Sequence, residues 1–124
     1  MKHLLTLLLV ASSAACFAQG NLQFNQVISI NTSNSWGTGG SSAGWQADLY
    51  TVPADKVFKL TSTHIGGSAA SESFTVNGTG VVADSGPIWL AAGDIIGVQG
   101  GASCNFCTVS LNGHFSGIEF SVSP

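Results

Sequence analysis

The chain has 124 residues, enough for one domain, and 44% of them are hydrophobic. Only 7% are charged, the formal net charge is −3 and arginine is absent, which argues against nucleic acids and acidic lipids as partners because both need clustered basic side chains. Serine, threonine, asparagine and glycine must cover much of the surface, a composition suited to contact with neutral glycans or with other copies of the chain.

Residues 1–18 have the pattern of a signal peptide. A basic Lys2 precedes a short leucine-rich run, and small residues lead to a cleavage site after Ala18. We therefore expect a mature chain of residues 19–124 that is secreted or held at the cell surface or in the periplasm. The competing interpretation is a lipoprotein signal in which Cys16 is lipidated. No later segment is long and apolar enough to cross a membrane as a helix.

The remaining sequence predicts strands and no helix. Apolar and polar residues alternate in short runs, and turn signals recur about every 8 to 12 residues. This pattern predicts one all-β domain, an antiparallel β-sandwich of jelly-roll type with about nine short strands. The expected strands are 22–30, 45–52, 57–63, 73–76, 81–83, 88–90, 94–99, 108–111 and 115–123.

Turn residues separate these strands. Pro53 has no amide hydrogen, so it ends the second strand and opens a corner before the third. Residues 91–94 form a similar corner. Asn77-Gly78 and Asn112-Gly113 are the dipeptides typical of two-residue hairpin turns. The polar segment 31–44 is predicted to be a long loop that carries Trp36, with a short edge strand within it as the alternative.

The alternation also predicts which side of each strand is buried. In every strand we expect the apolar side to face the core. The residues expected to be buried are Leu22, Phe24, Ile28 and Ile30 in the first strand, Trp45, Ala47 and Leu49 in the second, Phe58 and Leu60 in the third, Trp89, and Ile118, Phe120 and Val122 in the last. His64 is expected on the same side as Phe58 and Leu60. Tyr50 and Glu119 are expected on the opposite, outward side of their strands.

Two short motifs carry a resemblance to a known family. The corner at Leu90, Gly93 and Asp94, followed by Phe115-Ser116-Gly117, resembles the C-terminal half of the C1q/tumour-necrosis-factor-like jelly roll, and Tyr50-x-Val52-Pro53 is similar to an earlier strand of that fold. The corners also resemble those of small exported bacterial jelly rolls of unknown role. The resemblance implies a two-sheet sandwich that often forms trimers and binds without catalysis. It assigns a fold-determining role to Pro53, Leu90, Gly93, Asp94, Phe115, Ser116 and Gly117.

Cys104 and Cys107 are the cysteines that remain after cleavage of the leader. In an oxidising compartment a disulfide between them is expected, because a glycine-rich segment precedes Cys104 rather than a helix that would favour redox chemistry. Zinc binding is the alternative, and the only further ligands of the usual type are His64 and His114.

No convergent set of catalytic residues is visible. His114 and Ser116 lie two residues apart in one strand, whereas catalytic triads bring together residues from separate elements. We expect a protein that is not an enzyme and that has no cofactor and no metal. The alternative is a small secreted or periplasmic hydrolase or metal-binding protein that uses His64 and His114.

The expected function is therefore binding or self-assembly at the cell surface. Trp36 and Tyr50 are the candidate ligand-binding residues, since an aromatic ring among small polar neighbours can stack on a neutral sugar. For Trp36 the alternative is a ring folded over the edge of the sandwich. The partner could equally be a surface protein or further copies of the chain, including a homotrimer, and a purely structural subunit is a third hypothesis.

Overall fold

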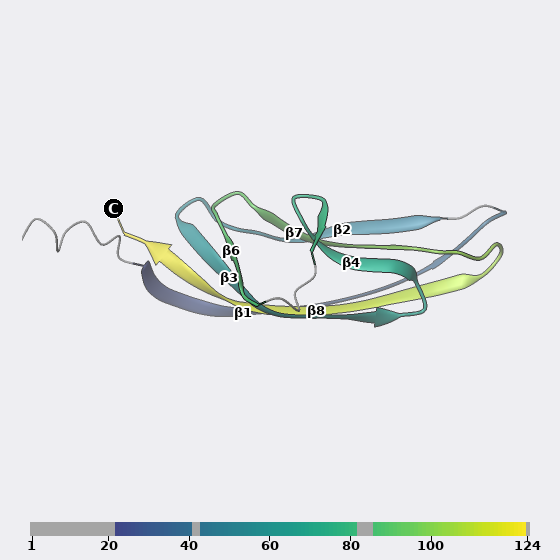
Figure 1. Cartoon of the computed structure of the whole chain (residues 1–124), viewed down its shortest axis with the longest axis horizontal. Helices are drawn as coiled ribbons and strands as arrows, with labels where there is room; N and C mark the ends of the chain where they lie inside the picture. Colours follow the sequence, from purple (N-terminus) through teal and green to yellow (C-terminus); the bar gives the residue numbers. More distant parts are fainter. Residues whose placement is uncertain (1–21, 41–42, 82–85, 124) are drawn as a thin grey trace, which may run out of the picture.

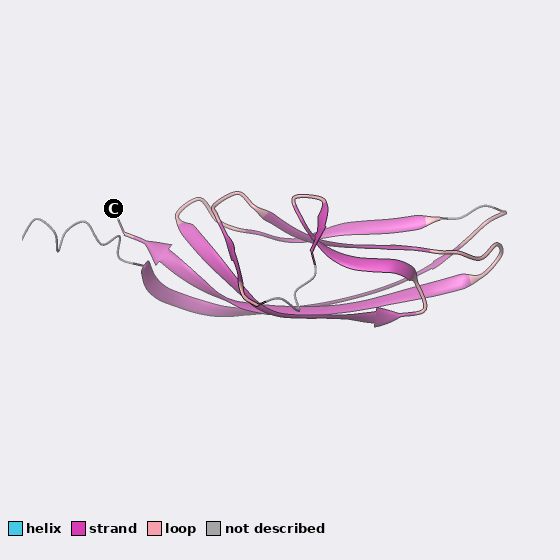
Figure 2. Cartoon of the chain, viewed as in Figure 1, coloured by secondary structure: helices cyan, strands magenta, loops and turns pink. Residues whose placement is uncertain are grey.

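A computed structural model describes residues 22–40, 43–81 and 86–123. The predicted signal peptide, with Cys16, lies outside the described residues. Within them all regular structure is β, in eight strands rather than about nine (Figure 2). The strands are β1 Leu22–Gly37, β2 Gly44–Thr51, β3 Lys56–Gly67, β4 Ala70–Val76, β5 Thr79–Val81, β6 Ile88–Leu90, β7 Ile95–Gly101 and β8 Thr108–Val122.

The strands form two four-stranded antiparallel sheets that lie one above the other (Figure 1). The strand order is β1-β8-β3-β6 in one sheet and β2-β7-β4-β5 in the other. Only β4 and β5 are consecutive strands of the same sheet, so every other connection passes from one sheet to the other. The all-β sandwich predicted from the sequence is confirmed.

The core lies between the sheets and is built around aromatic rings. Phe115 of β8 lies edge-on to Phe58 of β3 and to Phe74 of the opposite sheet, with ring centroids 6.3 and 6.1 Å apart. Burying such rings supplies much of the free energy that favours folding. The fully or almost fully buried apolar residues of this cluster are Val52, Phe58, Leu60, Phe74, Leu90, Ile96, Val98, Leu111 and Phe115.

The two predicted corners lie side by side and bond to each other. The Gly93 amide donates to the Val52 carbonyl at 2.9 Å, and the Val52 amide donates to the Asp94 carbonyl at 2.9 Å. Gly93 has a φ of 88°, which a residue without a Cβ adopts readily. The Asp94 carboxylate accepts from the Ala91 amide and from the Asn77 side-chain amide, each at 2.8 Å. The β2–β3 and β6–β7 connections are thus one hydrogen-bonded unit.

One predicted hairpin is confirmed and the other is wrong. Asn77 and Gly78 have φ values of 50° and 78°, as a tight turn between β4 and β5 requires. Asn112 and Gly113 instead lie within the uninterrupted β8. A Cβ at Gly113 would lie 3.2 Å from Cζ of Phe74, so this glycine makes room for a core ring and does not serve a turn.

In the segment 31–44 the alternative of an edge strand holds for residues 31–37, which extend β1 at the edge of its sheet. These residues pair with β8 along their length, from Asn31 opposite His114 to Gly37 opposite Thr108. Their outward side chains are exposed and alternate with half-buried inward ones. A strand with one face in solvent can therefore form from a segment that contains no hydrophobic run.

Three single-residue β-bulges invert predicted faces. Asn25 in β1, Leu49 in β2 and Thr61 in β3 are each an extra residue in the pairing register. A bulge shifts every later side chain to the opposite face. The face occupied by the first residues of a strand therefore does not determine the face occupied by the residues after the bulge. In β1, Leu22 and Phe24 consequently lie on the outer face, whereas Ile28 faces the core. In β2, Tyr50 faces the core. In β3, His64 faces outward although Phe58 and Leu60 are buried.

The last strand is also oriented opposite to the prediction, although β8 itself has no bulge. Its inward positions follow Leu111 and Phe115 in steps of two and reach the buried Glu119. Ile118 and Phe120 therefore face outward. Trp89, also expected in the core, is 52% exposed, whereas Trp45 packs against the core as predicted.

Candidate functional site

The candidate site is the outer face of the β1-β8-β3-β6 sheet, the side directed away from the second sheet. The register aligns its outward residues in rows across the strands: Phe24, Phe120 and Val57 form one row, and Val27 and Ile118 belong to the next. We call the apolar part of this face the apolar half. It consists of Leu22, Phe24, Val27, Val57, Trp89, Ile118, Phe120 and Val122.

The apolar half is unusually open for a surface of this composition. Five of its residues, Leu22, Phe24, Val27, Trp89 and Val122, are 45–65% exposed. The Trp89 ring packs on Phe120 at a centroid distance of 5.6 Å, and the ammonium group of Lys59 lies 5.3 Å from the Trp89 ring centroid. Lys59 is the only charged residue in these rows, and it interacts with an aromatic face rather than with an acid.

The other part of the same face is uncharged but polar, and we call it the polar half. Its side chains are short and lie in register across β1, β8 and β3. Ser33 donates to the Asn112 side-chain oxygen at 2.8 Å, and the next row joins Asn31, His114 and His64. Its members are Ser29, Asn31, Ser33, Ser35, Ser62, His64, Ser110, Asn112, His114 and Ser116.

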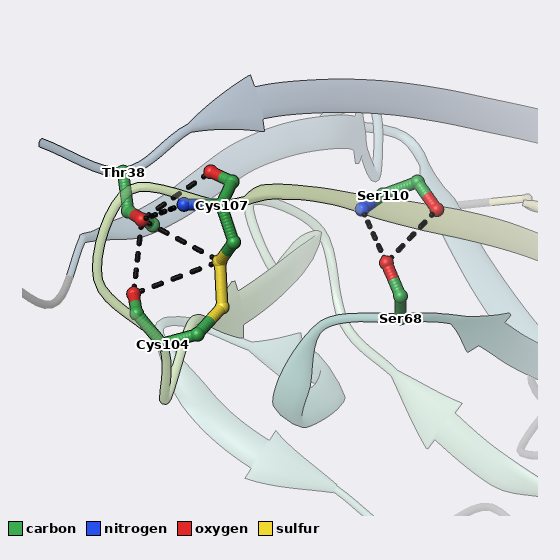
Figure 3. Close-up of a disulfide and its surroundings, with 5 residues drawn as sticks. All are labelled: Thr38, Ser68, Cys104, Cys107 and Ser110. Atoms are coloured by element: carbon green, nitrogen blue, oxygen red, sulfur yellow. Dashed lines mark hydrogen bonds between the residues drawn. A yellow bond between two sulfur atoms is a disulfide. The ribbon is translucent and has the colours of Figure 1, made fainter.

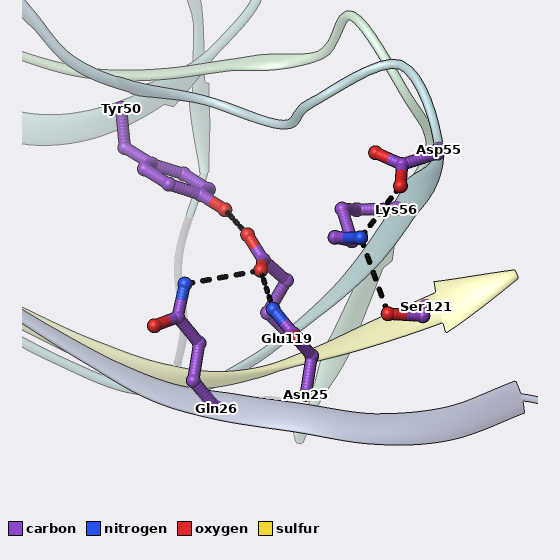
Figure 4. Close-up of polar contacts among 7 residues, drawn as sticks. All are labelled: Asn25, Gln26, Tyr50, Asp55, Lys56, Glu119 and Ser121. Atoms are coloured by element: carbon purple, nitrogen blue, oxygen red, sulfur yellow. Dashed lines mark hydrogen bonds and ion pairs between the residues drawn. The ribbon is translucent and has the colours of Figure 1, made fainter.

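A buried carboxylate lies beneath the apolar half. Glu119 is 2% exposed and faces the interior, where its side chain accepts hydrogen bonds from Asn25, from Gln26 at 3.1 Å and from the Tyr50 hydroxyl (Figure 4). The bulges at Asn25 and Leu49 bring these donors to Glu119. The charge is therefore satisfied by three neutral donors from two other strands.

These contacts change two titrations. Burial alone would raise the pKa of Glu119, but the hydrogen bonds from Tyr50, Asn25 and Gln26 outweigh it and lower the pKa below its usual value. Burial raises the pKa of the Tyr50 hydroxyl, and the hydrogen bond to Glu119 and the negative charge of that group raise it further. At neutral pH the pair is therefore a carboxylate and a neutral phenol.

The two candidate glycan-binding residues both point toward the core. Trp36 is half-buried and stacks on Trp45, with ring centroids 6.0 Å apart, and its indole N–H has no hydrogen-bond acceptor among the described residues. Tyr50 is half-buried against Phe58, at a centroid distance of 5.1 Å. Neither ring lies flat on the surface, and Trp36 and Tyr50 do not meet in one site.

Cys104 and Cys107 are joined by a disulfide in the β7–β8 connection (Figure 3). Thr38 anchors this loop to the end of β1. Its hydroxyl donates to the Cys104 carbonyl at 2.9 Å and accepts from the Cys107 amide at 3.0 Å. The same loop exposes Phe106, which is 83% accessible and lies apart from the apolar half. The loop is thus held by a crosslink and by a buried threonine, which is 5% exposed.

The residues assigned to the fold by resemblance lie at structural positions. Leu90 and Phe115 are core residues, Gly93 and Asp94 form the corner described above, and the Pro53 carbonyl accepts from the Lys56 amide in the opposite corner. The Ser116 carbonyl accepts from the Thr61 hydroxyl at 3.1 Å. Gly117 lies under the Phe58 ring, where a Cβ would come within 2.3 Å of Cζ.

His64 and His114 are brought together by the sheet, which their separation in the sequence did not predict. They are direct partners in the β3–β8 register and both face outward. Asn31 completes the row, with its side-chain oxygen 2.8 Å from Nδ1 of His114. Among the described residues no group of three or more histidine, cysteine or acidic side chains is placed to hold a metal.

Comparisons with known proteins do not extend these observations. No protein-family model, curated protein or solved structure matches the chain. The described residues contain no helix of the length and apolarity needed to span a membrane. The functional argument therefore depends on the outer face itself.

Proposed function

We propose that this chain is an exported, non-catalytic β-sandwich protein that acts by self-assembly through the apolar half of its outer face. The observation that carries the proposal is the set of exposed Phe24, Val27 and Trp89 in two adjoining rows, beside Ile118 and Phe120, on a nearly uncharged face. Monomeric soluble proteins rarely leave such a continuous apolar surface in water.

The size of the apolar half fits an interface. With exposures of 45–65% for its five most open side chains, it offers on the order of 500 Å² of apolar surface. A specific interface buries about 800 Å² per partner, with an apolar centre inside a polar rim. The apolar half would supply the centre, and the adjoining polar half would supply one side of the rim.

The favoured occupant is a second copy of the chain. A face whose only charged side chain is Lys59, which lies over the Trp89 ring, does not select a charged partner, and one charge per copy causes little repulsion between copies. When the same face packs on itself about a two-fold axis, each apolar residue meets apolar surface. The low charge of the whole chain, with 7% charged residues, keeps the repulsion between copies small.

Analytical ultracentrifugation over a roughly thousandfold concentration range tests this proposal. We expect reversible association of the unmodified chain. Val27→Asp should shift the protein to monomer, because a carboxylate would be buried at the apolar centre of the contact. Ser35→Asp is the matched control, since it adds the same charge to the same strand and face in the polar half, and it should still associate. A monomer at every concentration would contradict the proposal.

The strand order supports a finer assignment of the fold, which we include in the proposal. The orders β1-β8-β3-β6 and β2-β7-β4-β5, with connections that cross between sheets, are those expected when an eight-stranded chain forms two Greek keys, as in a jelly roll. Jelly rolls serve many unrelated functions, so this assignment does not select one.

The neutral-glycan hypothesis has less support than self-assembly. It depends on Trp36 and Tyr50, whose rings pack inward against Trp45 and Phe58. A glycan array would still decide it, since binding that Trp36→Ala abolishes without unfolding the protein would favour the sugar over the second copy.

A further inference from the structure

We infer that His64 and His114 form a two-imidazole site for a divalent late transition-metal ion on the polar half of the outer face. Of these ions, Cu²⁺ should bind most tightly. This inference is independent of the proposed self-assembly. It follows from the pairing of β3 with β8, which makes the two histidines direct cross-strand partners on the same face.

The spacing of the two side chains suits chelation. Directly opposite residues of an antiparallel pair have Cβ atoms about 4.5–5.5 Å apart. Imidazole nitrogens bind such metals at about 2.0–2.1 Å, so two rings that start at this separation can reach one ion between them. His64 is exposed and His114 is partly exposed, which leaves the remaining coordination positions to water.

Asn31 orients one of the ligands. Its side-chain oxygen lies 2.8 Å from Nδ1 of His114, and because a carbonyl oxygen only accepts, Nδ1 must carry the proton. In a neutral ring this leaves the lone pair on Nε2, the nitrogen that would bind the metal. Hydrogen bonding of the other ring nitrogen to an amide or carboxylate oxygen is the usual arrangement for a metal-bound histidine.

The neighbouring position along β3 leaves space for the ion. Nε2 of His64 would be 3.9 Å from a Cβ at Gly66, two residues further along the strand. A side chain at Gly66 would occupy the space beside the coordinating nitrogen. The glycine therefore keeps Nε2 of His64 accessible.

The chemistry of the row selects the class of metal. Its donors are two imidazoles, and the outward positions of the adjoining rows are serine, asparagine and glycine, with no carboxylate. Mg²⁺ and Ca²⁺ prefer several oxygen ligands, whereas Cu²⁺, Ni²⁺ and Zn²⁺ bind imidazole well, and Cu²⁺ is the strongest of the three.

Isothermal titration calorimetry with Cu²⁺, Ni²⁺, Zn²⁺ and Mg²⁺ tests the inference on the full chain without a histidine tag. His3, the third histidine, should be replaced by Asn in every sample so that only the two paired imidazoles remain. We expect one ion per chain, tightest for Cu²⁺, and no heat of binding with Mg²⁺. His64→Asn and His114→Asn should each lower the Cu²⁺ affinity more than tenfold, and Asn31→Ala should lower it by roughly tenfold.

Ser116→Ala is the matched control, because it changes the neighbouring outward residue of β8 and leaves both imidazoles in place; its Cu²⁺ affinity should equal that of the parent. Electron paramagnetic resonance of the Cu²⁺ complex should show coupling to two nitrogens. Coupling to one nitrogen, or a single histidine variant that retains the parent affinity, would overturn the inference. Circular dichroism of each variant separates loss of the site from loss of the fold.

Discussion

At the scale of single residues, the most informative group is the buried Glu119 with its three donors. A carboxylate between two sheets is costly unless its oxygens are hydrogen-bonded, and here Asn25, Gln26 and Tyr50 supply the bonds. Because these donors come from β1 and β2, the network ties both sheets together at one end of the sandwich. Two titrations report on it.

The first titration is that of Tyr50, the only tyrosine in the chain. Its pKa is raised by burial and by Glu119, so tyrosinate absorbance should appear well above the ordinary value of about 10. The neutral phenol stabilises the fold below about pH 10, and this contribution is lost as the pH rises through the folded-state pKa. Glu119→Gln should move the transition back toward pH 10, whereas Glu72→Gln should not. An unshifted transition in the parent would contradict the network.

The second titration is that of Glu119 itself. Its pKa is lowered in the fold, so the carboxylate contributes stability above its unfolded pKa of about 4.3, and this contribution is lost as the pH falls through the folded-state value. Urea unfolding at a series of acidic pH values measures it. Glu119→Ala should lower the free energy of unfolding by about 1–3 kcal/mol at neutral pH, because three donors lose their acceptor. It should also flatten the dependence on pH below 4.3, and an unchanged slope would count against the assignment.

At the scale of elements, β8 is one of the two inner strands of its sheet and joins β1 to β3. Its glycines are sites of close contact. Gly117→Ala would place a Cβ 2.3 Å from the Phe58 ring and 2.5 Å from the Lys59 carbonyl. We expect a loss of about 1–3 kcal/mol in the free energy of unfolding, as for other overpacked cores. Gly37→Ala is the control, since nothing lies within 4 Å of its Cβ, and equal effects of the two changes would refute the packing argument.

The β7–β8 connection gives a second prediction for an element. The Cys104–Cys107 bridge closes a very short loop, so its removal should cost about 1–2 kcal/mol, near the low end for disulfides. Chemical denaturation of the double Cys→Ser variant measures this cost. Alkylation without reductant, followed by intact mass measurement, should leave both cysteines unlabelled, and two labelled thiols at Cys104 and Cys107 would show that the bridge is not formed.

At the scale of the whole molecule, the proposed assembly should be insensitive to ionic strength. No residue of the apolar half is charged, and the one charged side chain in its rows is Lys59, so screening has almost nothing to weaken. Sedimentation between about 0.1 and 1 M sodium chloride should show association that is equal or stronger at high salt. Association that weakens with salt would mean that charged contacts elsewhere on the surface hold the copies together.

For the molecule as a whole, some features of the fold could be predicted from the sequence and others could not. The fold class followed from the alternation, and both corners from Pro53 and Gly93. The Asn-Gly signal alone was not sufficient, since Asn77-Gly78 forms a turn whereas Asn112-Gly113 lies within β8. The facing of side chains was not, because a bulge such as Asn25 or Thr61 reverses the alternation without a compositional signal. The outward apolar residues of β6 and β8, strands without a bulge, were also expected in the core, because alternation defines two faces and does not say which of them is buried. The apolar half was therefore predicted to be core.

The histidine row was unpredictable for a different reason. His64 and His114 are fifty positions apart, and only the register of β3 on β8 makes them neighbours. Turn chemistry and alternation describe each strand alone, whereas register is a property of the pair. Glu119 illustrates the same limit, since its donors come from strands far away in the chain.

The pairing of β1 with β8 has a consequence for how the polypeptide reaches its native state. The residues joined at one end of this ladder, Leu22 and Val122, are among the first and last that the structure describes. Contacts of such long sequence separation form late and slow folding. A chain that emerges from a ribosome or a secretion channel starting at its N-terminus cannot complete this sheet until the whole of β8 has appeared. The β1–β8 ladder therefore closes only after β8, the last strand, is free to pair along its whole length.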